Sequence, residues 1–196
     1  MLIQVIEGKV KDADLLRRQM ERWRGELKPG ASGYLGSTGG ITADGRGITL
    51  ARFESEQAAK ANSDRPEQGA WWNETAKAFD GPATFHDCRE VDLLLGGGSN
   101  DAGFVQIIQG RAKNESEMRK RVSELEGQLR ERRPDILGMM LAWHGDGGFT
   151  QAVYFTSEEN ARRQEQATEQ DQLRQEYMSL FEGQPTFFDL TEPELD

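Results

Sequence analysis

The chain has 196 residues, of which 36% are hydrophobic and 30% are charged, and its formal net charge is −10. This composition is typical of a folded protein, and no apolar run approaches the roughly 20 residues that a membrane-spanning helix needs. The acidic balance argues against nucleic acid as a partner, because phosphate backbones are bound by concentrated basic surfaces.

A single cysteine, Cys88, and two histidines, His86 and His144, further limit the chemistry. One cysteine cannot form an intramolecular disulfide, which suits a reducing compartment, and so few metal-binding side chains predict no metal site. A strand pattern begins within residues 1–6 and leaves no room for a signal sequence. We therefore expect a cytoplasmic protein with no membrane partner.

The first half of the chain predicts the order strand, helix, strand, strand, helix, strand. Asp12 or Asp14 can cap the first helix, Asp44 and Gly45 are typical of a hairpin turn, and Pro66 interrupts the second helix. The predicted elements are a strand at 2–10, a helix ending near 28, strands at 34–42 and 47–53, a helix at 55–81 interrupted at 62–66, and a strand at 84–91.

The second half repeats the first half at an offset of 102 residues without a gap. The segment 51–59 recurs at 153–161, and Gly36 recurs as Gly138, which we interpret as a close approach or a bulge within a strand. The repeated elements are strands at 104–112, 135–144, 148–155 and 185–190, and helices at 114–132 and 157–181. The predicted organisation is a first repeat at 1–94, a glycine-rich linker at 95–103 and a second repeat at 104–196.

Each repeat has the element order of a ferredoxin-like unit, βαββαβ, in which two helices cover one face of a four-stranded antiparallel sheet. The other face of each sheet would expose a large apolar surface, and the second repeat can cover that of the first. We therefore expect an α+β chain whose two tandem ferredoxin-like units form one α/β barrel. Such a chain would be a monomer with an internal pseudo-dimer, or a homodimer.

One segment carries a family resemblance. Residues 62–72, Asn-Ser-Asp-Arg-Pro-Glu-Gln-Gly-Ala-Trp-Trp, and the exit turn 79–82, Phe-Asp-Gly-Pro, resemble the second helix of antibiotic biosynthesis monooxygenase-like domains. These domains are members of the dimeric α/β-barrel superfamily, and the resemblance covers both repeats. It implies the barrel fold in tandem form but not one activity, because the superfamily holds cofactor-independent oxygenases, haem-degrading enzymes and members with no known activity.

The resemblance also bears on cofactors. Haem-degrading relatives use an asparagine on the first strand with a tryptophan and a histidine on the second helix. Here the first strands carry Gln4 and Gln106, and neither second helix contains a histidine. We therefore expect no haem and no other cofactor, because the oxygenases of this family hold an electron-rich aromatic substrate in a dry pocket and let its anion react with oxygen.

The second strands of the two repeats differ in bulk. Residues 33–41 are mostly small, whereas 135–143 include Met139, Met140 and Trp143. If both strands line the barrel, the first repeat leaves volume that the second repeat fills, which predicts one asymmetric pocket nearer the first repeat. The alternative is that the bulky residues only complete a core.

Strand alternation selects candidate site residues. Phe53 should face the helices, which places Arg52 and its counterpart Tyr154 toward the barrel interior. Inside the barrel Arg52 would need an anion, whereas at the rim it could lie in water. Asp87 and Asp189 are either a pair of carboxylates or hydrogen-bonding residues at the rim.

Helix geometry and histidine chemistry add two more candidates. Trp71 and Trp72 point about 100° apart on a helix, and their counterparts are Leu173 and Arg174. Trp71 is therefore expected in the core, and Trp72 is expected to be exposed or to face the pocket. His86 could act as a general base or could simply be accommodated in the strand. The predicted ligand contacts are Tyr34, Arg52, Trp72, His86, Trp143 and Tyr154, with His86 and Arg52 as catalytic candidates.

These features predict a protein that binds a small aromatic molecule. The resemblance implies a cofactor-independent monooxygenase acting on a phenolic or polyketide-like compound. Two alternatives remain open: a non-catalytic ligand-binding or stress-response protein, and an interaction protein whose barrel is filled by its own side chains.

Overall fold

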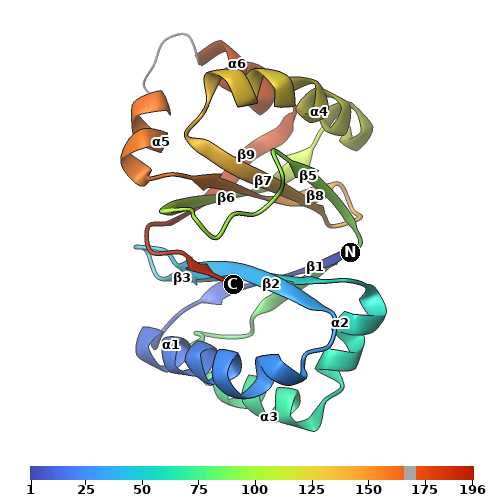
Figure 1. Cartoon of the computed structure of the whole chain (residues 1–196), viewed down its shortest axis with the longest axis vertical. Helices are drawn as coiled ribbons and strands as arrows, with labels where there is room; N and C mark the ends of the chain where they lie inside the picture. Colours follow the sequence, from blue (N-terminus) through green and yellow to red (C-terminus); the bar gives the residue numbers. More distant parts are fainter. Residues whose placement is uncertain (166–170) are drawn as a thin grey trace. The chain divides into compact units, whose positions relative to one another are not determined.

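Two units, each built on one antiparallel sheet, make up the chain in the computed structural model, which describes residues 1–165 and 171–196 (Figure 1). The first unit comprises Met1–Arg89 and Glu194–Asp196, and the second unit comprises Glu90–Pro193. The chain is therefore α+β, as predicted. No helix in the described residues is long and apolar enough to cross a membrane.

The first unit has a five-stranded sheet in the order β10-β2-β3-β1-β4, with α1, α2 and α3 on one face (Figure 1). Its strands are β1 (Leu2–Lys9), β2 (Tyr34–Ile41), β3 (Arg46–Phe53), β4 (Thr84–Cys88) and β10 (Glu194–Leu195). Its helices are α1 (Ala13–Arg22), α2 (Glu56–Ser63) and α3 (Pro66–Thr75), with a π turn at Trp23–Leu27 and 3-10 turns at Lys28–Gly30 and Ala76–Ala78. The predicted interruption before Pro66 is thus confirmed as the break between α2 and α3.

The second unit has the same layout, with the order β5-β7-β8-β6-β9 and its helices on one face of the sheet (Figure 1). Its strands are β5 (Glu90–Leu94), β6 (Phe104–Ala112), β7 (Ile136–Trp143), β8 (Gly148–Phe155) and β9 (Phe181–Leu190). Its helices are α4 (Glu115–Arg132), α5 (Glu158–Glu165) and α6 (Asp171–Ser179). Of the helix predicted at 157–181, residues 166–170 lie outside the described residues.

The two halves of the chain share individual hydrogen bonds at equivalent positions. The side chain of Asp12 accepts from the backbone N–H of Leu15 at 2.8 Å, and Asn114, 102 positions later, accepts from Glu117 at 3.0 Å. Both side chains satisfy an N–H group that the first turn of a helix leaves unpaired. The hairpin turns are held alike, by Val10 N–H to Gly45 O in the first unit and by Ala112 N–H to Gly147 O in the second.

The fifth strand of each sheet corrects the predicted boundaries. A single strand was expected at 84–91, but it breaks at Arg89, and β5 pairs with β7 in the second unit. Likewise β10, at the far end of the second repeat, pairs with β2 of the first unit. β-propensity predicts that a segment is a strand but not which sheet it joins, and the 102-residue offset between Asp92 and Glu194 shows that both strands belong to the repeat.

Gly36 and Gly138 confirm the expected bulges and close approaches. The register of β2 shifts before Gly36 and that of β7 shifts before Gly138. A Cβ atom would lie 2.1 Å from the backbone oxygen of Asp196 at Gly36, and 1.7 Å from that of Gly97 at Gly138. Only glycine allows the segment that carries the fifth strand to cross the bulge this closely.

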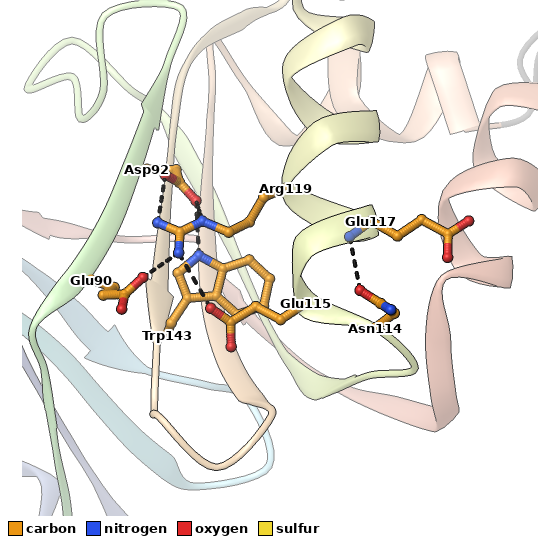
Figure 2. A network of polar contacts seen from close by, with 7 residues as sticks. All are labelled: Glu90, Asp92, Asn114, Glu115, Glu117, Arg119 and Trp143. Carbon is orange, nitrogen blue, oxygen red and sulfur yellow. Dashed lines mark hydrogen bonds and ion pairs between the residues drawn. The ribbon is translucent and has the colours of Figure 1, made fainter.

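An arginine anchors each fifth strand. Arg119 of α4 forms ion pairs with Glu90 and with Asp92 of β5, and Asp92 also accepts the indole N–H of Trp143 at 2.8 Å (Figure 2). In the first unit, Arg24 contacts Glu194 of β10 at 3.0 Å. Arg119 has more partners than Arg24, because Glu115 also lies 3.3 Å from Arg119.

Candidate functional site

The first unit contains a cavity of about 90 Å³ between its sheet and its helices. Small residues on β2, among them Ser37 and Gly39, leave this space open on the helix side of the sheet rather than on the predicted barrel side. The prediction of one pocket nearer the first repeat is wrong, because the second unit has a cavity as well. Trp23, Trp71 and Trp72 come from the helical side and provide much of the wall. The other residues that line the cavity and enter the argument below are Tyr34, Thr49, Asn62, Gln68, Thr75 and Asp196.

The aromatic rings of this wall are in contact with one another. The ring centroids of Trp23 and Tyr34 lie 4.8 Å apart in an edge-to-face arrangement, and those of Trp23 and Trp71 lie 6.4 Å apart. Two indole N–H groups are satisfied: that of Trp23 donates to the side chain of Gln68 at 2.9 Å, and that of Trp71 donates to Gln19 O at 2.8 Å. These bonds fix the ring orientations and leave π faces, rather than indole N–H groups, to contact a ligand.

Polar side chains interrupt the aromatic wall. Asn62 is buried, and its side-chain oxygen accepts from Arg65 at 2.9 Å. Thr75 is also buried, and its hydroxyl donates to Trp71 O at 2.9 Å. These contacts hold α2 and α3 at the cavity and place an amide beside the rings.

Tyr34 and Asp196 form the most acidic part of the cavity. The hydroxyl of Tyr34 donates to Asp196 at 3.3 Å, and Lys28 forms an ion pair with the same carboxylate. Burial raises the pKa of Tyr34 above its usual value, and the neighbouring Asp196 adds to the shift. The phenol therefore stays protonated near neutral pH and acts as a hydrogen-bond donor.

The second unit contains a larger cavity of about 170 Å³ in the equivalent place, between its sheet and its helices. Its wall is mainly aliphatic, and its polar members include Gln106, Arg133, Gln151 and Tyr177. Gln151 occupies the position of Thr49, and Tyr177 occupies that of Thr75, each 102 residues later. Side chains that were not singled out from the sequence thus distinguish the two cavities.

Of the predicted ligand contacts, Tyr34 and Trp72 line the first cavity together. Trp71, expected in the core, is buried and also lines it. Arg52 lies on the sheet face opposite the helices, as the alternation predicted, and its Nη2 donates to the backbone oxygen of Asp196 at 2.8 Å. His86, paired in register with Val5, lies half-buried on that same face.

The two remaining predicted contacts, Trp143 and Tyr154, are buried among packed side chains of the second unit. Trp143 packs against Phe149 in the core beneath the helices, and its N–H is bound by Asp92. Tyr154 is buried on the opposite face of the sheet, with its hydroxyl 3.9 Å from the sulfur of Met140. Neither residue lines the two cavities described above.

The prediction that the bulky strand fills the barrel side is therefore wrong for two of its residues. Met139, Leu141 and Trp143 belong to the core under the helices of the second unit, whereas Met140 and Ala142 have the opposite orientation. The alternative, that the bulky residues complete a core, is thus confirmed for Met139 and Trp143. The error came from assigning the whole strand to one face, although side chains alternate along it. Trp23 lies in the wall of the first cavity, a position for which the sequence carries no separate signal.

The remaining polar candidates have ordinary partners. Gln4 donates to Asp87 at 2.8 Å, and Gln106 donates to Asp189 at 2.9 Å, so the two aspartates act as hydrogen-bonding residues, one in each unit. Burial raises the pKa of Cys88 to about 12, which keeps the thiol protonated and unreactive. Within residues 1–165 and 171–196, no cluster of three His, Cys, Asp or Glu side chains could hold a metal ion.

Comparisons with solved structures identify the fold. The "putative monooxygenase" of Lactobacillus acidophilus NCFM matches with a TM-score of 0.71 at 11% identity, covering 96% of this chain and 91% of that one. An anthrone oxidase-like protein matches with a TM-score of 0.68 at 13% identity, covering 99% and 92%. A ferredoxin-fold protein related to antibiotic biosynthesis monooxygenases, from Listeria monocytogenes 4b F2365, matches with a TM-score of 0.53 at 9% identity, covering 96% and 92%.

No protein-family model matches the sequence, and no curated protein is similar to it in sequence. The structural matches span nearly the whole of each chain, so they apply to the two units together. This chain has the tandem ferredoxin-like fold of proteins similar to antibiotic biosynthesis monooxygenases. At these identities the likeness establishes the fold, and the chemistry must be argued from the cavities.

Proposed function

We propose that this protein binds a small phenolic compound in the cavity of the first unit and oxygenates it without a cofactor. The observation that carries the proposal is the wall formed by Trp23, Tyr34, Trp71 and Trp72 around a cavity that also contains buried amide and hydroxyl groups. Aromatic faces bind a planar ring, and a few placed polar groups orient it. The names of the structural neighbours, monooxygenase and anthrone oxidase-like, agree with this chemistry.

The proposed reaction needs no external reductant. A methylene group next to a phenolic ring is oxidised to a carbonyl by one molecule of oxygen: one oxygen atom enters the product, and the other leaves as water with the two methylene hydrogens. The substrate supplies all the electrons once its phenolic proton has been removed. In this arrangement the carboxylate of Asp196 accepts that proton, and the hydroxyl of Tyr34, which stays protonated, turns its single hydrogen from Asp196 to the substrate oxygen.

Cavity size limits the substrate. An engineered apolar cavity of about 150 Å³ takes up benzene, so a cavity of about 90 Å³ admits a ring only if a wall side chain moves. Trp72 is the one half-buried tryptophan of the described wall, and its ring packs on Phe85, which is 44% exposed. We therefore assign Trp72 as the side chain that moves to admit the substrate, with single-ring phenols entering more readily than fused-ring ones.

The test is oxygen uptake with phenols that carry an activated methylene and have one, two or three rings. The wild type should consume one oxygen per carbonyl formed, with the single-ring compound fastest. Trp72→Ala should shift the preference toward larger compounds, and Tyr34→Phe should lower the rate about tenfold or more through loss of a hydrogen bond to the reacting oxygen. Tyr154→Phe, which alters a hydroxyl outside both cavities, is the matched control.

Two outcomes separate this proposal from its alternative, a non-catalytic binding protein. Saturable binding of phenols that Trp72→Ala alters, without oxygen uptake by any of them, would favour the binding protein. If the phenols neither bind nor react, the first cavity is not a phenol site and the proposed function is wrong.

A further inference from the structure

We infer that the second unit carries a separate binding site for a neutral, mostly apolar ligand with one hydrogen-bond acceptor, such as an aryl ketone, and that the side-chain amide of Gln151 meets this acceptor. The inference concerns a different cavity from the phenol site and does not rest on the proposed function. It starts from one buried amide whose hydrogen bonding is incomplete.

Gln151 is fully buried and lines the cavity of about 170 Å³. Its side-chain oxygen accepts a hydrogen bond from the hydroxyl of Tyr177, but its Nε2 has no partner among the described residues. An unpaired amide N–H in the interior costs free energy, so buried donors are nearly always paired with protein, water or ligand. Gln151 lines a space large enough to hold a partner for this donor.

The orientation of the amide determines which kind of ligand atom fits. Burial raises the pKa of Tyr177, so its hydroxyl keeps the proton that it donates to Gln151. If the amide were turned over, Nε2 would donate to the Tyr177 oxygen, and both the phenolic hydrogen and the amide oxygen would lack partners. The observed orientation leaves fewer unpaired atoms, and the unpaired one is a donor. The ligand must therefore supply an acceptor.

The charges around the cavity predict that the ligand is neutral. Arg133 donates to both carboxylate oxygens of Asp135, at 2.9 and 2.7 Å, so its charge is balanced within the protein. The amide of Gln106 is likewise engaged with Asp189. Among the described lining residues an ionic ligand would find no unbalanced counter-charge to replace its lost hydration, whereas a carbonyl would lose little and gain a hydrogen bond.

Cavity size and wall chemistry set the body of the ligand. Ile108, Val122, Leu125 and Val153 give the wall its aliphatic character. A volume of about 170 Å³ exceeds the roughly 150 Å³ that suffices for benzene, so one ring with a short substituent fits without rearrangement. The first unit cannot offer the same contact, because threonines occupy the positions of Gln151 and Tyr177 there.

The test compares acetophenone with α-methylstyrene, which has the same shape but carries a methylene group in place of the carbonyl oxygen. Binding to the full chain is followed by NMR through the side-chain amide resonance of Gln151, assigned by its absence in a Gln151 variant. Acetophenone should shift this resonance and bind about five to ten times more tightly than α-methylstyrene, the ratio expected for one net hydrogen bond.

Two variants separate a ligand contact from a structural role. The double variant Gln151→Leu with Tyr177→Phe removes both polar partners, so it should fold with unchanged or higher thermal stability and bind both probes equally. Thr49→Val changes the equivalent position of the first unit and should leave the preference intact. The inference is wrong if the wild type binds both probes equally or neither, in which case water serves the amide, or if the double variant keeps the preference for acetophenone.

Discussion

The two units share their backbone but not their cavities. The helix caps, the hairpin turns, the bulge glycines and the fifth strands recur at one offset, with the same hydrogen-bond pattern. The cavities differ in volume, in aromatic content and in the pair Thr49 and Thr75 against Gln151 and Tyr177. The backbone hydrogen bonds and bulges are thus the same in the two units, whereas the side chains that line the cavities differ. Substitutions at equivalent positions of the two units should therefore both lower the free energy of unfolding. Any difference in size should come from the contacts that differ between the units.

The largest effects are expected at the bulge glycines. Gly138→Ala places a methyl group 1.7 Å from the backbone oxygen of Gly97, whose own N–H is bound to Leu94 O, so neither partner can move cheaply. We expect a loss of about 3 kcal/mol in the free energy of unfolding, in the range of severe overpacking. Urea denaturation followed by circular dichroism measures it.

Gly36→Ala is the matched substitution in the first unit. Its methyl group meets the backbone oxygen of Asp196 at 2.1 Å, and the backbone there has φ of +124°, which strains any residue except glycine. Backbone hydrogen bonds to Ser37 and a bond from Arg52 hold Asp196 in place, so moving it aside breaks these contacts. We expect a loss of about 2 kcal/mol, smaller than at Gly138 because the overlap is less severe, together with displacement of Asp196 from Tyr34. Wild-type stability in both variants would refute the close approaches.

A smaller difference is expected between the two arginine anchors. Arg119→Met removes ion pairs to Glu90 and Asp92 and leaves Asp92 with the indole of Trp143 alone (Figure 2). Because Arg119 and Asp92 are about one third exposed and Glu90 is 64% exposed, we expect a loss of only about 1–2 kcal/mol. Arg24→Met breaks the single pair with Glu194 and should cost less than about 1 kcal/mol.

Lys120→Met is the control for both arginine variants, because Lys120 lies on α4 and forms an exposed ion pair with Glu124 at 3.8 Å. It should leave the urea midpoint unchanged. Equal losses in Arg24→Met and Arg119→Met would mean that the additional partners of Arg119 contribute nothing. Trp143 fluorescence should change only in Arg119→Met, because the guanidinium lies over that ring.

Much of the fold could be predicted from the sequence because its signals are local or repeated. Turn residues, helix caps and the interruption at Pro66 each act within a few residues. The repeat at an offset of 102 positions allows each element to be predicted from two sequences. What could not be predicted was which sheet the fifth strands join, since pairing with β2 or β7 is a long-range choice that leaves no local pattern.

The cavities were harder to predict for a related reason. Tyr34 and Trp72 were identified because they contrast with their counterparts, but the pocket was expected on the barrel side of the sheet. Gln151 and Tyr177 lie far apart in the sequence, and their hydrogen bond depends on packing between β8 and α6. Gln151 alternates with Phe149, Val153 and Phe155, so the pattern places it on the helix side of its sheet, but nothing in the sequence identifies its hydrogen-bond partner.

The smallest effect is expected at Asp44 and Asp146 of the two hairpin turns, whose contributions to the stability of the fold depend on pH. The backbone N–H of Gly148 lowers the pKa of Asp146, and the hydroxyl of Thr42 lowers that of Asp44. A carboxyl group whose pKa is lower in the folded state stabilises the fold above its unfolded pKa, about 3.8, and this contribution is lost as the pH falls through the folded pKa. Both turns should therefore contribute near neutral pH and cease to contribute in acid.

Asp146→Asn and Asp44→Asn test this, because asparagine keeps an oxygen that can accept the same hydrogen bond but has no charge. Each variant should unfold at a slightly lower urea concentration than the wild type near neutral pH, and the difference should disappear well below pH 4. Asp146 has a backbone donor, which stays in place when the carboxylate is neutralised, whereas the Thr42 hydroxyl can rotate to another acceptor. Asp146→Asn should therefore recover more of the wild-type stability than Asp44→Asn. The opposite order would mean that side-chain contacts, rather than the shared backbone, hold the hairpin turns.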